Sequence, residues 1–86
     1  MSRAATLTVG AAAGTLVSVA MQVMLNGEAR EVPTALTVAT LLTHLEIDAR
    51  RVAVEVNETV VKRARYDATP IESGDVIEIV NFVGGG

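Results

Sequence analysis

The sequence predicts an α+β fold in which a single helix packs on one face of a mixed sheet of four to five strands. Three observations support this. Apolar and polar residues alternate in several short runs, as strands with one buried face require. Only one stretch, after residue 37, has the spacing of an amphipathic helix. The chain has 86 residues, of which 50% are hydrophobic, so it holds one small domain.

The first two strands form a predicted hairpin. Residues 21–25 alternate between an apolar face and an opposite face. Asn26-Gly27 is the strongest short hairpin signal, because both central positions of a type I′ turn need positive φ. Residues 30–32 then return as the second strand, which Pro33 stops.

A helix is predicted after Thr37, whose hydroxyl can accept from the free amides of the first turn. Four apolar residues follow at helical spacing: Val38, Leu41, Leu42 and Leu45. The helix is expected to run for roughly 9 to 11 residues and to end near Ile47-Asp48. His44 lies off the apolar stripe, so we expect an exposed surface histidine.

The remaining strands are expected at residues 52–56, 60–61 and 76–82, with a polar, turn-rich connection over 62–75. A turn at Asn57-Glu58 joins the first two of these strands, and Ser73-Gly74-Asp75 turns the chain into the last. The last strand has the most strictly apolar inward face, formed by Ile77 and Ile79. We therefore expect it to lie in the middle of the sheet.

Residues 1–20 differ in kind from the rest, being small and weakly apolar with a single charge at Arg3. They loosely match a signal peptide, with Ser18-Val19-Ala20 as a cleavage site, but Thr and Gly interrupt the apolar part. The run is also too broken for a transmembrane span. We favour a poorly ordered extension, with Met21 opening the folded domain.

Composition excludes several classes of function. The net charge of −3 argues against a nucleic-acid partner. Without cysteine the chain has no disulfide, thiolate nucleophile or cysteine metal site, which is compatible with a reducing cytoplasm. A lone histidine cannot build a metal site. The acidic residues are scattered without a paired base or metal partner, which disfavours an enzyme: Glu55, Glu58, Glu72, Asp75 and Glu78.

Four quoted segments resemble the ThiS/MoaD family of ubiquitin-like β-grasp proteins, and most narrowly its ThiS branch. They are "MQVMLNGE", "LTVATLLTHL", "VAVEVNETVV" and "IESGDVIEIVNFVGGG", which lie within residues 21–86. The resemblance implies a β-grasp domain at 21–83 and a flexible glycine tail at 84–86. The family does not normally carry the extension at 1–20.

The resemblance also implies a cytoplasmic sulfur carrier of thiamin biosynthesis rather than an enzyme. A ThiF-like partner would adenylate Gly86 with ATP, and a persulfide from a cysteine desulfurase would convert it to a thiocarboxylate. Thiazole synthase (ThiG) would take that sulfur to build the thiazole ring. The carrier itself would bind no cofactor tightly.

This chemistry fits the residues before the end of the sequence. Three extended glycines reach roughly 10 Å beyond Val83, and without Cβ atoms they can thread a narrow channel in a partner. Ordering such a tail costs entropy, so a docking surface is needed to offset it. We expect this docking surface on the outward face of the sheet, formed by Val80, Phe82, Ala53 and Met24. The tail that enters the channel of the partner would consist of Gly84, Gly85 and Gly86.

Other interpretations share the same fold. The small subunit of molybdopterin synthase, or a carrier serving cysteine or methionine synthesis, would use the same glycines. The molybdopterin subunit usually shows a proline-containing stretch before them, whereas "NFVGGG" does not. A ubiquitin-like modifier would join Gly86 to lysines instead. A plain interaction module would use no chemistry at its end.

Overall fold

The structure is a computed structural model and describes residues 20–82. Residues 1–19 and 83–86 lie outside the described residues, and with them lie the glycine tail and almost all of the predicted extension. The strands are β1 (Ala20–Leu25), β2 (Glu28–Pro33), β3 (Val52–Val56), β4 (Thr59–Val61) and β5 (Val76–Asn81). The helix is α1 (Val38–His44), and two short 3-10 turns are η2 (Ala49–Arg51) and η3 (Arg63–Arg65).

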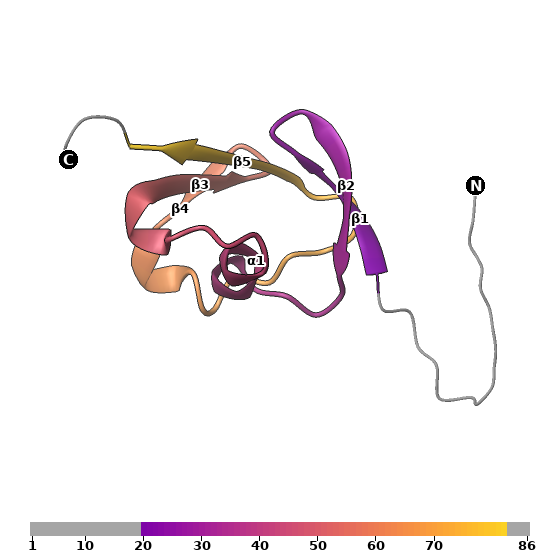
Figure 1. The fold of residues 1–86 in the computed structure, drawn as a ribbon, viewed down its shortest axis with the longest axis horizontal. Coiled ribbons are helices and arrows are strands. Elements are labelled where there is room, and N and C mark those ends of the chain that lie inside the picture. The colour runs from indigo at the N-terminus through magenta and orange to yellow at the C-terminus, as the bar shows by residue number, and fades with distance from the viewer. Residues whose placement is uncertain (1–19, 83–86) are drawn as a thin grey trace, which may run out of the picture.

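The five strands form one mixed sheet in the order β2-β1-β5-β3-β4, and α1 packs on one of its faces (Figure 1). β1 and β5 are parallel, while the other neighbouring strands are antiparallel. The predicted fold class is therefore confirmed. The expected central place of the last strand is confirmed as well, since β5 has β1 on one side and β3 on the other.

The hairpin of β1 and β2 turns where the sequence predicts. Asn26 and Gly27 have φ values of 50° and 85°, and Leu25 pairs with Glu28 across the turn. β2 is longer than expected, because it begins at Glu28 and includes Pro33, so the prediction that Pro33 stops the strand was wrong. A proline is tolerated there because β2 is an edge strand, so its missing N–H interrupts no ladder on the open side.

The helix begins as predicted but is shorter. The Thr37 hydroxyl accepts from the Thr40 amide at 3.2 Å, and the Thr40 hydroxyl accepts from the Thr37 amide at 2.7 Å. α1 has 7 residues and ends because Glu46 takes a φ of 62°. The Glu46 amide then donates to Thr43 and the Ile47 amide to Leu42, which closes a Schellman motif.

The core lies between α1 and the inward face of the sheet. The helix contributes Val38, Leu41 and Leu42 of the predicted apolar stripe, whereas Leu45 is the C-cap and is half-buried. His44 is exposed as expected. The buried apolar residues are Val23, Leu25, Val32, Val38, Leu41, Leu42, Val52, Val54, Tyr66, Ile71 and Ile77. Tyr66 and Ile71 come from the connection that the sequence marked only as polar and turn-rich. The Tyr66 hydroxyl donates to the Val52 carbonyl at 3.3 Å, which satisfies its polar end.

Candidate functional site

The sheet face that points away from α1, here called the outward face, carries an exposed apolar patch. Its exposed members are Met24, Val60, Val76, Val80 and Phe82, and the half-buried Ala53 lies among them. Val80 is 59% exposed and Phe82 is 55% exposed, although both lie in or next to the central strand. Such a patch on a small protein is typical of an interaction surface.

The strand register brings the four sequence-predicted docking residues onto this face. Ala53 lies directly opposite Val80 in the β3–β5 pair, and Phe82 is the residue that follows β5. Met24 lies beside Val76 in the β1–β5 pair, at the other end of the face. The structure adds Val60 and Val76, which are 64% and 43% exposed. Whether the patch binds a partner stays a prediction.

An acidic pair divides the apolar patch. Glu55 lies directly opposite Glu78 in the antiparallel β3–β5 ladder, and both side chains are exposed. Like charges at directly opposed positions repel each other. A cationic side chain of a partner placed between them would remove that repulsion. The outward face therefore favours a partner surface that combines apolar and basic groups.

β5 is held on both sides near its end, at Ile79 on the β1 side and at Phe82 on the β3 side. On the β3 side the Phe82 amide donates to the Arg51 carbonyl at 2.8 Å. On the β1 side the Asn26 side chain accepts from the Ile79 amide at 2.7 Å and donates to the Ile79 carbonyl at 3.2 Å. The chain thus leaves the sheet from an anchored strand. The predicted tail residues Gly84, Gly85 and Gly86 lie outside the described residues.

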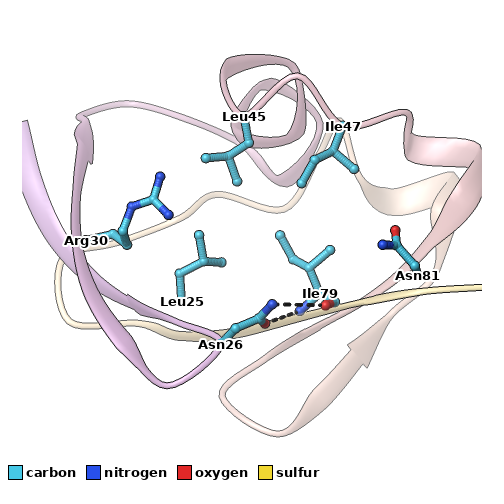
Figure 2. Close-up of a pocket in the computed structure, with 7 residues that line it drawn as sticks. All are labelled: Leu25, Asn26, Arg30, Leu45, Ile47, Ile79 and Asn81. Carbon is cyan, nitrogen blue, oxygen red and sulfur yellow. Dashed lines mark hydrogen bonds between the residues drawn. The ribbon is translucent and has the colours of Figure 1, made fainter.

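A pocket of about 330 Å³ lies on the helix side of the sheet, beside this exit (Figure 2). Apolar side chains from the sheet and from the segment that follows α1 face one another across it, with polar side chains at its rim. The lining residues are Leu25, Asn26, Arg30, Leu45, Ile47, Ile79 and Asn81. No local sequence pattern indicates this pocket, because its walls come from segments far apart in the chain.

The described residues offer little for catalysis or metal binding. No group of three or more His, Asp or Glu side chains within residues 20–82 could hold a metal ion. Hydrogen bonds from Arg50 lower the pKa of Asp48 to about 2, but Asp48 is an exposed residue that caps η2. Between Ala20 and Phe82, no helix has the length and apolar character needed to cross a bilayer.

Comparison with known proteins agrees with this geometry. Residues 23–86 match the model of the ThiS family. A crystal structure of a thiamine biosynthesis protein (ThiS) from Geobacter metallireducens superposes with a TM-score of 0.69 and 38% identity. The match covers 77% of this chain and 100% of that one. The sulfur carrier protein ThiS of Bacillus subtilis is 40% identical over 50 residues, or 58% of this chain and 76% of that protein.

Two further relatives are much longer. The thiazole synthases of Paramagnetospirillum magneticum and Magnetococcus marinus are 42% and 41% identical over 66 residues. These matches cover 77% of this chain but 20% of each thiazole synthase. The chain therefore resembles a segment that spans about a fifth of their length.

Proposed function

The chain belongs to the ThiS family of sulfur carriers in thiamin biosynthesis, and from this premise we propose that it carries sulfur as a thiocarboxylate on Gly86. The observation that supports this most directly is the extent of the family match, which runs from β1 through residue 86 and so includes the three glycines. In this proposal the chain is a co-substrate of its partners and not an enzyme.

The proposed chemistry makes a poor electrophile reactive in two stages. The Gly86 carboxylate attacks the α-phosphorus of ATP in the adenylating partner, and pyrophosphate leaves. The terminal sulfur of a persulfide, supplied by a cysteine desulfurase, then attacks the acyl carbon and AMP leaves. This step forms a C–S bond and keeps the S–S bond of the persulfide. A thiol of the partner then attacks the inner sulfur of that S–S bond, which forms a disulfide and releases the thiocarboxylate. We place these steps in a reducing cytoplasm, where thiols persist.

The fold's part in this chemistry is presentation. Anchoring of β5 at both edges directs the chain toward the partner, and glycines without Cβ atoms pass through a narrow channel. The outward face supplies the docking energy that offsets the ordering of the tail. Thiazole synthase is the acceptor in this proposal, and the thiazole synthases that contain a similar segment support that choice.

Mass spectrometry of the intact chain tests the proposal. After incubation with a ThiF-like adenylating enzyme, ATP and a persulfide donor, the mass should rise by the difference between one sulfur and one oxygen. Fragmentation should place the change on Gly86. Adducts on lysine would indicate a ubiquitin-like modifier instead. An unchanged mass would contradict both functions.

Two variants make this test specific. Deletion of Gly86 should abolish sulfur loading but leave thermal unfolding unchanged, because the core lies within residues 20–82. Gly85→Val should also block loading, since its branched Cβ would not pass a channel shaped for glycine. Equal loading of these variants and the parent chain would exclude Gly86 as the sulfur-bearing residue.

A further inference from the structure

The parallel pairing of β1 with β5 stops before β5 ends. Its register covers Met24 with Val76 and Leu25 with Ile77, after which β1 turns away into β2. The Asn26 backbone amide donates to the Ile77 carbonyl at 2.9 Å. The Asn26 side chain then acts as a short substitute strand, because it both donates to and accepts from the backbone of Ile79.

The next position along this edge, Asn81, has no such substitute. Ile77 and Ile79 direct their backbone groups toward β1, whereas Val76 and Phe82 bond to the β3 side. By the alternation of a strand, the N–H and C=O of Asn81 point to the side that β1 has left. No residue from 20 to 82 pairs with them there. An open strand edge is a template for another extended chain.

The pocket lies next to this open edge. Leu45 and Ile47 face Leu25 and Ile79 across it, as Figure 2 shows, so one apolar side chain can enter between helix and sheet. Arg30 stands at the opposite side of the pocket from Asn81. Its register partner is the buried Val23, which places Arg30 on the helix side of the sheet.

Arg30 carries a charge without a counter-ion in the described part of the chain. The ion pairs among residues 20–82 join Asp48 to Arg50 and to Arg51, and none includes Arg30. A guanidinium at the rim of an apolar pocket is a suitable partner for a carboxylate, which it can bind with two parallel hydrogen bonds.

We infer that the open edge at Asn81 and the pocket beside it bind an extended segment of the adenylating enzyme. This segment pairs with the Asn81 backbone as an added strand, inserts one apolar side chain between Ile47 and Ile79, and sets a carboxylate at Arg30. The pocket lies on the opposite face of the sheet from the apolar patch, so the partner contacts β5 on both faces. The inference rests on the proposed function for the identity of the partner.

An added strand at Asn81 also explains how a glycine tail is aligned. Backbone pairing needs no side chains, so it can continue past Asn81 toward the glycines. Each residue held in the ladder is extended, which directs the following residues straight into the active site. Main-chain pairing supplies affinity here, and the pocket with Arg30 supplies specificity.

Amide hydrogen exchange with the purified adenylating enzyme tests the pairing. In the ¹⁵N-labelled chain, exchange of the Asn81 amide should slow by about tenfold or more on binding. The Ile79 amide, already bonded to Asn26, serves as the internal control in the free chain. Unchanged exchange at Asn81 in the saturated complex would overturn the inference. Protection that depends on the concentration of the free chain would also overturn it, in favour of a second copy at this edge.

A charge-reversal pair tests the carboxylate. Arg30→Glu should raise the Kd for the adenylating enzyme by about tenfold or more, measured by calorimetry. Arg65→Glu is the matched control, because it makes the same charge change at an exposed residue of η3. Equal Kd values for the two variants would overturn the role of Arg30. A parent chain that binds but gains no sulfur at Gly86 would contradict the proposed function alone.

Discussion

At the scale of single residues, Asn26 has two structural roles. Its φ of 50° forms the first half of the β1–β2 turn, where asparagine is tolerated better than most residues. Its side chain bonds to both backbone groups of Ile79, 53 positions along the chain. One residue therefore sets the local turn and fixes the hairpin to the central strand.

Substitution of Asn26 separates these two roles. Asn26→Ala should lower the free energy of unfolding by about 2 kcal/mol, because it loses two hydrogen bonds and strains a positive φ. Asn26→Gly loses the same hydrogen bonds without the strain and should cost about 1 kcal/mol. Urea denaturation measures both values. Wild-type stability in both variants would show that the bonds to Ile79 contribute nothing.

At the scale of elements, the two ends of α1 are stabilised in different ways. The first turn has a reciprocal pair of threonines, Thr37 and Thr40, that satisfies two free amides. The last turn closes through Glu46, although this position usually holds glycine because its φ is positive. The helix end is thus correctly hydrogen-bonded but conformationally strained.

Relief of this strain should stabilise the protein. Glu46→Gly is expected to raise the free energy of unfolding by about 0.5 kcal/mol, since glycine adopts positive φ without steric cost. Thr43→Gly is the control inside the helix and should lower it by about 0.5 kcal/mol. Chemical denaturation of the two variants gives opposite shifts in midpoint. A loss of stability in Glu46→Gly would contradict the strain at this helix end.

At the scale of the whole molecule, β5 has one face in the core and one face on the proposed docking surface. Ile77 is fully buried against the helix side, whereas Val80 is 59% exposed on the outward face. Three residues apart on one strand, they belong to different surfaces. Changes in docking and changes in folding should therefore be separable by the direction of the side chain alone.

Two alanine substitutions test this separation. Ile77→Ala should cost about 3 kcal/mol of unfolding free energy because it leaves a cavity in the core. Val80→Ala should cost less than about 1 kcal/mol. It should nevertheless weaken binding to the adenylating enzyme by about tenfold, since the burial of a valine side chain is worth about 1.5 kcal/mol. Unchanged binding of Val80→Ala would remove Val80 from the docking surface.

Local signals in the sequence were sufficient for much of the fold. Asn26-Gly27 predicts its turn because the required φ values suit these residues, and the stripe from Val38 to Leu45 predicts the helix by spacing. The place of β5 followed from its apolar inward face. The common face of the four predicted docking residues followed from alternation along the strands.

Other features could not be predicted because they depend on contacts between distant segments. Tyr66 and Ile71 are buried, but neither lies in a periodic run of the sequence. The Tyr66 hydroxyl donates to the Val52 carbonyl, a contact that links distant segments. The early end of α1 could not be predicted, because the positive φ that ends a helix is usually marked by a glycine, and Glu46 occupies this position. The pocket and the open strand edge at Asn81 could be recognised only from the strand order, since β1 and β5 are far apart in sequence.

The parallel contact of β1 with β5 also governs how the chain can fold. The strand at the centre of the sheet is the last of the five to leave the ribosome, and β1 and β3 both need it as a neighbour. Until residues 76–81 emerge, β1 and β3 are open edges in addition to β2 and β4, and the sheet is not continuous. Sheet closure joins segments some 50 residues apart, a slow step in folding. Folding is therefore tied to synthesis of the segment that leads into the tail, so a truncated carrier has no finished surface to offer a partner.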